Sequence, residues 1–244
     1  MSRQSLLAGS LIFTIVITGC TTHEPFTVSQ EQFFAKTKTI ALVPVTVPEG
    51  LEDAEPVKIK FESMIAAKLR DAGFVIVPSQ EYSQIYRRVA EQGEAYPDSM
   101  MSEKKEAHFK ELHETTCKEL CTQFKVDAIL YPSIGVVTAE WLSGRASWWG
   151  TSESVEPITQ AYLRSLFMST SGTVPALVLR VVVTDVTGSQ LYTDGGGIQV
   201  LSKLSGLKTF VPVQRHELFV NEDRNSKAVN LALEKLLMKP TPKQ

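Results

Sequence analysis

Residues 39–47 read Thr-Ile-Ala-Leu-Val-Pro-Val-Thr-Val, a nearly continuous apolar run in which β-branched side chains are frequent. Such a run predicts a β-strand that is covered on both faces, as the strands of parallel sheets are. Pro44 cannot donate a hydrogen bond to a neighbouring strand, so it predicts a bulge or an early end. We therefore expect a buried strand that begins at Thr39.

A helix and a second strand are predicted directly downstream. Apolar side chains recur there at the spacing of one helix face, namely Phe61, Met64, Ile65, Leu69 and Ala72. Gly73 stands where glycine commonly ends a helix, and residues 74–78, Phe-Val-Ile-Val-Pro, form another short apolar run. A strand, a helix and a strand in this order predict a parallel pair joined by a right-handed crossover.

The remaining patterns predict a mixed α/β fold. They are a helix that starts at Ser79, a long helix from Ser102, a strand over 126–137, an antiparallel hairpin of 176–184 with 190–193, and a C-terminal helix that Pro240 ends. The predicted fold class is therefore α/β, with a single domain whose mixed sheet, parallel plus an antiparallel hairpin, is flanked by helices.

Composition limits the classes of partner. The chain of 244 residues carries 25 Lys and Arg against 27 Asp and Glu, and 43% of its residues are hydrophobic. This length fits one domain of generous size with a real core. The near-neutral charge and the lack of a basic stripe predict no nucleic-acid partner.

The apolar run of residues 6–20, which ends in Ile-Thr-Gly-Cys, resembles a bacterial lipoprotein signal peptide with its lipobox. Arg3 supplies the positive charge that precedes it, and the run is too short for a comfortable membrane span. The resemblance implies cleavage before Cys20 and a covalent lipid on that residue, with no other cofactor. Thr21 stands where an Asp would resemble an inner-membrane retention signal, so the expected location is the periplasmic face of the outer membrane. A secretory peptide cut elsewhere and an uncleaved anchor are the alternatives.

These features give the expected organisation. Residues 1–19 are the signal peptide, 20–38 a lipidated tether, and 39–240 an α/β periplasmic domain with an insertion at about 140–175.

The order of the predicted elements resembles a known group of envelope lipoproteins. The runs that carry the resemblance are Ile40-Ala41-Leu42-Val43-Pro44, Phe74-Val75-Ile76-Val77-Pro78, Val126-Asp127-Ala128-Ile129-Leu130 and Asp185-Val186-Thr187-Gly188. The group includes the amino-terminal domain of TolB, the curli-secretion channel lipoproteins and the outer-membrane activators of bifunctional penicillin-binding proteins. The resemblance covers about residues 39–201 and implies the α/β architecture and a role exerted through protein contacts in the envelope, without a catalytic constellation. The short tether departs from the activators, and the helical spacing of Ile158, Tyr162, Leu166 and Phe167 departs from the channel proteins.

The expected insertion holds all three tryptophans, Trp141, Trp148 and Trp149. Indole rings are enriched at binding hot spots and also suit a membrane interface. With Tyr162 and Phe167, they are the predicted partner contacts. The alternative, which we weigh equally, is that the indoles cover an edge or a face of the sheet.

The segment His113-Glu114-Thr115-Thr116-Cys117, together with Cys121, has a spacing that places three metal-ligand types on successive turns of a helix. Cys117 and Cys121 also fall on the apolar stripe that this helix needs for burial, so core packing is the preferred interpretation and no metal site is predicted. A disulfide between Cys117 and Cys121 is a separate alternative in an oxidising periplasm.

Other catalytic patterns are lacking. Gly195-Gly196-Gly197 is followed by strand-forming residues and not by a helix, so it predicts a bulge or bend and not a phosphate loop. The sequence thus favours a non-enzymatic interaction or assembly factor of the envelope. Its expected partners are the membrane, through the lipid on Cys20, an envelope protein of unknown identity and copies of itself. A ring-forming subunit of a secretion or transport complex and a metal-binding or hydrolytic envelope protein are the other candidates.

Overall fold

The parallel part of the sheet is built on the first predicted strand. A computed structural model describes residues 24–49, 54–92, 102–155, 171–205 and 209–239. In it β1 (Thr39–Leu42) pairs in parallel with β2 (Val75–Val77) on one side and with β3 (Ala128–Leu142) on the other. The connection from β1 to β2 carries α2 (Ala54–Asp71). The predicted parallel crossover is confirmed, and β1 ends before Pro44, as expected from the missing donor.

The antiparallel part of the sheet is longer than the sequence predicts. β3 pairs along its whole length of 15 residues with β6 (Ser171–Asp185), which in turn pairs with β7 (Gln190–Val200). The turn between β6 and β7 is closed by the Asp185 carboxylate, whose Oδ1 accepts hydrogen bonds from the backbone N–H groups of Thr187 and Ser189. The predicted hairpin and the mixed sheet are both confirmed.

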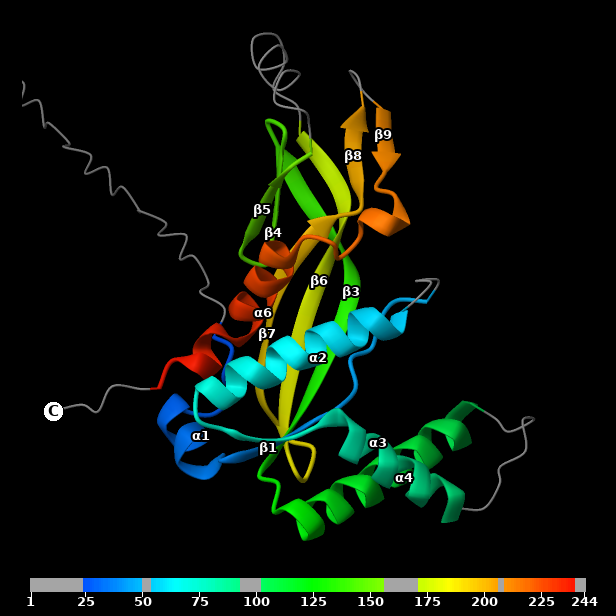
Figure 1. Cartoon of the computed structure of the whole chain (residues 1–244), viewed down its shortest axis with the longest axis vertical. Helices are drawn as coiled ribbons and strands as arrows, with labels where there is room; N and C mark the ends of the chain where they lie inside the picture. Colours follow the sequence, from blue (N-terminus) through cyan, green and yellow to red (C-terminus); the bar gives the residue numbers. More distant parts are fainter. Residues whose placement is uncertain (1–23, 50–53, 93–101, 156–170, 206–208, 240–244) are drawn as a thin grey trace, which may run out of the picture.

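Helices cover the two faces of the sheet (Figure 1). α2 and α6 (Glu222–Leu237) pack on one face, in a core that includes Ala128 and Leu130. α3 (Ser79–Gln92) and α4 (Ser102–Phe124) pack around Ile129 in a second cluster. Because successive strand residues point to opposite faces, the two clusters lie on opposite sides of β3. The mixed α/β class predicted from sequence is therefore confirmed.

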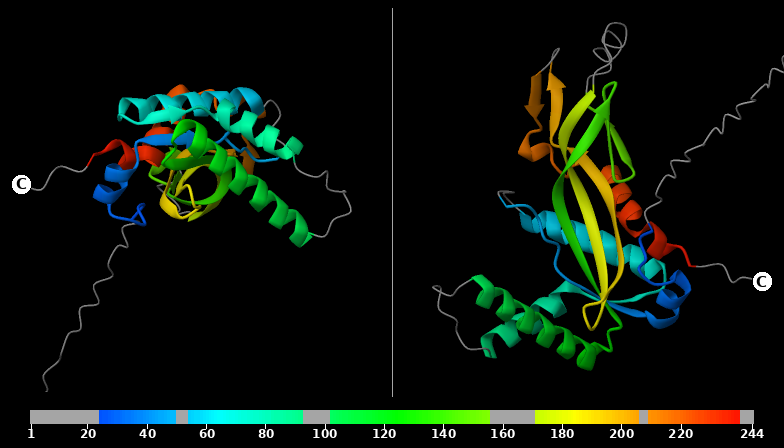
Figure 2. Two further views of the ribbon diagram at one scale, coloured as in Figure 1. Left: turned by 90° about the horizontal axis from the view of Figure 1, so that it is seen from below. Right: turned by 180° about the vertical axis from the view of Figure 1, so that it is seen from behind.

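The far end of the long β3–β6 pair extends beyond the helices, as Figures 1 and 2 show. There the chain continues from β3 into β4 (Arg145–Trp148) and β5 (Thr151–Ser154). This meander curls back so that the Gly197 N–H on β7 donates to the Trp149 carbonyl, with N and O 3.1 Å apart. A third cluster of buried residues fills the fold that results. A separate hairpin, β8 (Ser202–Ser205) with β9 (Thr209–Pro212), and a short 3-10 helix, η1 (Arg215–Glu217), were not predicted.

The expected insertion is smaller than predicted. Residues 140–142 and 171–173 pair with one another inside the sheet, so the β3–β6 ladder continues into both ends of the expected 140–175 segment. Residues 156–170, which include the expected contact residues Tyr162 and Phe167, lie outside the described residues.

The expected tether also differs from the structure. Phe26 forms a bridge with Tyr192 on β7, and α1 (Gln30–Lys36) follows within residues 20–38. The Phe33 ring is only 2% exposed and packs against the rings of Phe26 and Phe74. Burial of these aromatic side chains holds the segment on the body, so the expectation that residues 26–38 belong to a tether is wrong. Cys20 and the expected signal peptide, residues 1–19, lie outside the described residues.

No helix in the described part of the chain has the length and apolar character needed to cross a membrane.

Candidate interaction site around Trp149

Two of the three tryptophans are core residues. Trp141 and Trp148 are each 7% exposed and belong to the cluster beneath the β4–β5 meander. The Trp148 indole Nε1 donates a hydrogen bond to the Leu177 carbonyl oxygen, 2.9 Å away. Their indoles cover a face of the sheet, which was the alternative to partner contact. The predicted contact role is therefore corrected for these two residues, because their rings are enclosed by the sheet that folds over them.

Trp149 is different, since its side chain is 38% exposed. It occupies the two-residue turn between β4 and β5, where Trp149 has φ +40° and Gly150 has φ +70°. Tight hairpins of this kind need positive φ at both turn positions, which favours Asn-Gly and disfavours a bulky first residue. An indole is thus held where a small polar residue would be less strained.

Three consecutive glycines of β7 form the surface against which Trp148, Trp149 and α6 pack. They are Gly195, Gly196 and Gly197. A Cβ on Gly195 would lie 2.8 Å from Trp149 Cε3, and one on Gly197 would lie 2.6 Å from Trp148 Nε1. A Cβ on Gly196 would lie 2.0 Å from the carbonyl oxygen of Ala228 on α6. The expected bulge is confirmed beside this run, where the register of β7 shifts against Leu177 and Val178. The glycines therefore permit close approach of tryptophans and helix from opposite faces of β7.

A cleft of about 430 Å³ opens beside Trp149, and we call it the Trp149 cleft. Its walls come from the β4–β5 turn, β7 and α6. The lining residues are Trp149, Gly150, Asp194, Gly195, Leu231 and Glu234. The aromatic ring, the glycine floor and two carboxylates thus meet in one depression at the surface.

Negative charge gathers at this cleft. Asp194 Oδ1 accepts a hydrogen bond from the Gly195 N–H, with a distance of 2.8 Å between the heavy atoms. The pKa of the nearby Tyr192 phenol is raised well above its ordinary value, first by burial and then by the negative charges of Asp194 and Glu234. The carboxylates are therefore close enough to act on a common neighbour.

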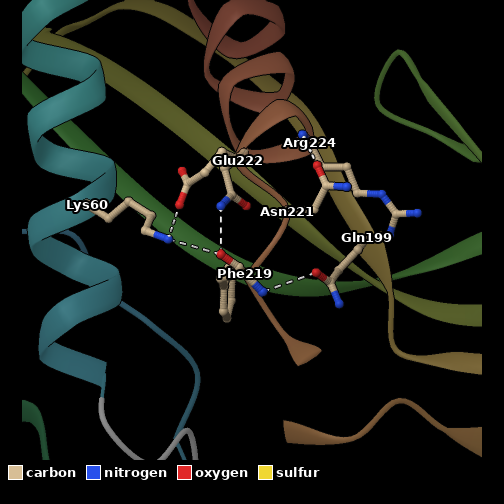
Figure 3. A network of polar contacts seen from close by, with 7 residues as sticks. Lys60, Gln199, Phe219, Asn221, Glu222 and Arg224 are labelled. Carbon is tan, nitrogen blue, oxygen red and sulfur yellow. Dashed lines mark hydrogen bonds and ion pairs between the residues drawn. The ribbon is translucent and has the colours of Figure 1, made fainter. Parts of the chain in front are cut away.

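The helical wall of the cleft is fixed at its N-terminal end by a polar network, shown in Figure 3. Lys60 on α2 donates to the Phe219 carbonyl oxygen at 3.1 Å and pairs with Glu222 at 2.6 Å. The Phe219 N–H donates to Gln199 Oε1 on β7 at 3.2 Å. Asn221 caps α6, since its Oδ1 accepts from the Arg224 N–H at 3.0 Å.

A partly buried ion pair joins the same helix to the meander. Arg224 Nη1 lies 2.8 Å from Oε1 of Glu153 on β5, whose side chain is only 9% exposed. Glu153 Oε2 also accepts from the Val200 N–H at 2.9 Å. Glu153 thus links β5 to both β7 and α6. The cleft therefore lies between secondary-structure elements that are fixed to one another by polar contacts.

The His113 segment, whose spacing resembles that of metal ligands, forms a packed cluster of side chains in the structure. His113 on α4 has one ring nitrogen 3.1 Å from the Tyr82 hydroxyl and the other 2.8 Å from the Tyr131 hydroxyl. Burial lowers the pKa of His113, and burial raises the pKa of the Cys117 thiol to about 11. Cys117 and Cys121 are free thiols, so the disulfide alternative is not formed in the structure. No three His, Cys, Asp or Glu side chains gather in a metal-binding arrangement within the described residues.

Sequence reasoning missed most of the Trp149 cleft. Asp194, Leu231 and Glu234 come from two elements that are far from Trp149 along the chain. The glycine run was the available signal, because three consecutive glycines in a strand indicate close approach of other groups.

The fold defines a class, a mixed α/β protein with helices on both faces of one sheet. No family model matches the chain, and no curated protein matches it. Among solved structures, a variant of PelC from Paraburkholderia phytofirmans, described as a dodecamer, is 10% identical with a TM-score of 0.36, over 84% of this chain and 91% of that chain. A hypothetical protein from Chlamydia trachomatis is 11% identical with a TM-score of 0.33, over 82% of this chain and 91% of that chain. At TM-scores this low, neither likeness carries an argument about function.

Proposed function

We propose that this protein is a non-enzymatic interaction factor of the bacterial cell envelope that contacts a protein partner through the Trp149 cleft. The observation that carries the proposal is the exposed indole of Trp149, held at the mouth of a cleft between three ordered elements. Tryptophan is one of the residue types enriched among the few side chains that carry most of the binding energy of an interface. The turn position of Trp149 is unfavourable for a bulky residue, so local backbone preference does not account for it.

The residues with catalytic potential have structural partners. Both ring nitrogens of His113 face tyrosine hydroxyls, and the Cys117 thiol is buried with a raised pKa. A thiol of this kind is a poor nucleophile at neutral pH, because the thiolate is the reactive form. These contacts support a packing role for the cluster and a function without catalysis.

The proposed lipid on Cys20 places the site close to a membrane. The Thr193 N–H donates to the Pro25 carbonyl at 2.8 Å, so the chain is already on the body at Pro25, beside Asp194 of the cleft. Five residues lead from Cys20 to Pro25, and a chain of this length spans at most about 17 Å. A lipid anchor at Cys20 would therefore hold the Trp149 cleft near the periplasmic surface of the outer membrane, where the partner is expected.

Photo-crosslinking in cells tests the proposal. The photoreactive residue p-benzoylphenylalanine is placed at Leu231 in the cleft wall, with position 110 on α4 as the control, since the Lys110 side chain is 78% exposed. We expect one discrete adduct with another envelope protein from position 231 and none from position 110. Adducts at multiples of the chain's own mass would indicate self-assembly instead. Failure to form any specific adduct at position 231 would contradict the proposal.

A further inference from the structure

A second cleft, of about 630 Å³, lies where β7, β8, η1 and the start of α6 meet, and we call it the Gln199 cleft. Its lining includes Gln199, Lys203, Val213, Glu217, Val220 and Arg224. Among the described residues, it shares none of this lining with the Trp149 cleft. We infer that the Gln199 cleft binds the terminal carboxylate of a peptide whose last side chain is apolar. This second site goes beyond the proposed function and does not depend on it.

The Gln199 side chain offers hydrogen-bond donors that the protein itself does not use. Gln199 is only 4% exposed, and its Oε1 accepts a hydrogen bond from the Phe219 N–H at 3.2 Å. This contact fixes the orientation of the amide, and Figure 3 shows Nε2 directed away from Phe219. Nε2 has no hydrogen-bond partner within the described part of the chain, although the side chain lines the cleft. A buried amide without an acceptor is unfavourable, so a ligand that brings an acceptor oxygen gains hydrogen bonds here.

A free ammonium group in the same cleft favours an acceptor with a negative charge. Lys203 on β8 lines the cleft, is exposed and has no ion-pair partner among the residues that the structure describes. Arg224 already pairs with Glu153, so we do not count it as a free charge. The Glu217 carboxylate also lines the cleft and would repel a phosphate dianion more strongly than a carboxylate. The charges therefore favour a ligand group with a single negative charge.

An apolar surface lies beside these polar groups. Val213 and Val220 both line the cleft, and Val220 is 63% exposed. Phe219, which precedes Val220, has φ +61°, a value that is uncommon for a bulky residue. Its carbonyl oxygen accepts hydrogen bonds from Lys60 at 3.1 Å and from Asn225 Nδ2 at 2.8 Å. The strained turn is thus held by the surrounding structure, and the exposed valine next to it is part of a fixed surface.

This combination of groups matches the end of a peptide chain. At a C-terminal residue the carboxylate and the side chain leave the same Cα atom, so an apolar group lies directly beside the charge. The side chain of Asp or Glu ends in its carboxylate and brings no such group. A fatty acid has a long apolar chain, which two valines do not cover. Capture of a C-terminal carboxylate is a recurring mode of peptide recognition.

The test uses the lipidated protein in detergent micelles. Calorimetry measures the affinity, and the NMR signal of the Gln199 side-chain amide, assigned by its absence from Gln199→Glu, locates the site. The probe is acetyl-Ala-Val with a free carboxylate. Its matched controls are acetyl-Ala-Val-amide, which lacks the charge, and acetyl-Ala-Gly, which lacks the apolar side chain. We expect a saturable shift with the probe, at least about tenfold weaker binding of the amide and about threefold weaker binding of the glycine peptide.

Matched variants locate the charges. Lys203→Gln is expected to weaken binding of the probe about three- to tenfold. Lys235→Gln removes the same charge from an exposed position about 20 Å along α6 from its N-cap and should leave binding unchanged. Glu217→Gln should strengthen binding about threefold, because it removes a repelling carboxylate. Gln199→Glu can still accept from the Phe219 N–H but has lost the donors, so it should abolish binding. Unchanged tryptophan indole signals would show that each variant is folded.

Several outcomes would overturn the inference. They are no saturable shift with the probe, equal binding of the amide or of the glycine peptide, no effect of Lys203→Gln, and full binding by Gln199→Glu. Tighter binding of methyl phosphate, of octanoate or of free valine would also contradict it, because these compounds represent phosphate esters, fatty acids and free amino acids. Crosslinking from position 231 tests the other cleft, so the proposed function stands or fails separately.

Discussion

At the scale of single residues, Gly196 on β7 lies against the backbone of Ala228 on α6. The place of a Cβ on Gly196 is already occupied by backbone, only 2.0 Å from the Ala228 carbonyl oxygen, and backbone cannot move aside as the end of a side chain can. The close packing of α6, which forms one wall of the Trp149 cleft, therefore requires a residue without a Cβ at position 196.

A substitution series at two strand glycines tests this dependence. Gly196→Ala should lower the free energy of unfolding by about 3 kcal/mol, because α6 must move away from β7. Gly135→Ala on β3 is the matched control, since nothing lies within 4 Å of its Cβ position. The control should change stability by less than about 1 kcal/mol. Urea unfolding measures both, and equal effects of the two changes would contradict the close packing of α6.

His113 gives a prediction about pH. Burial lowers its pKa in the folded protein, so at mildly acidic pH the unfolded chain binds more protons than the folded chain. The stability that neutral His113 contributes is therefore complete above its unfolded pKa of about 6.5 and is lost as the pH falls below that value. Wild type should lose more unfolding free energy between pH 7.5 and pH 5.5 than His113→Gln does. Parallel pH profiles, measured by urea unfolding, would mean that His113 is not held neutral.

At the scale of elements, the sequence predicted the helices and strands whose own residues carry a repeating apolar pattern. Residues 39–78 gave a strand, a helix and a strand because a helix face and a buried strand each leave a repeating apolar pattern. The length of β3 and β6 was underestimated, since their far ends are held by pairing with each other and not by their own composition. The β8–β9 hairpin was missed for the same reason.

Within the site, the tryptophans show most clearly what could not be predicted from the sequence. Trp148 is the last residue of β4 and pairs with Thr151, while Trp149 is the first residue of the turn. Trp148 therefore packs inside the meander, whereas Trp149, one residue further on, is turned outward by the positive φ of the turn and is partly exposed. Composition identified the three tryptophans, but only the position of the turn decided which of them lines the cleft.

The helix α1 is an element that the sequence analysis assigned to a tether. Phe33→Ala should reduce the free energy of unfolding by about 3–5 kcal/mol, because its ring is 2% exposed within the main core. Gln32→Ala changes the exposed neighbour on the same helix and should stay within about 0.5 kcal/mol of wild type. If chemical denaturation showed no loss for Phe33→Ala, residues 24–38 would be a tether after all.

At the scale of the whole molecule, the body and its proposed anchor are linked by a very short connection. Gln30 Nε2 on α1 donates to the carbonyl oxygens of Lys235 and Met238 at the end of α6, at 3.1 Å and 2.7 Å. The N-terminal segment thus contacts the C-terminal end of α6, the helix that carries Glu234. Figure 2 shows α1 beside the C-terminal end of α6. The lipid that we propose on Cys20 would therefore hold this side of the body close to the membrane.

Removal of the lipid site should separate location from folding. Cys20→Ala is expected to move the protein out of the outer-membrane fraction, because the acyl chains supply the membrane affinity. The urea midpoint should not change, since the described fold begins after this residue. Membrane fractionation with and without globomycin, which inhibits lipoprotein signal peptidase, provides the measurement. An unaltered distribution of Cys20→Ala would contradict lipid anchoring.

The most direct measurement of the central claim is the amount of crosslink-identified partner that co-purifies with the detergent-solubilised protein, compared between wild type and Trp149→Asn. Asparagine suits the positive φ of the turn, so folding and membrane fraction should be retained. Loss of a hot-spot indole costs about 2 kcal/mol or more, which predicts at least about a 30-fold weaker complex. Undiminished partner on the Trp149→Asn protein would contradict recognition through this cleft.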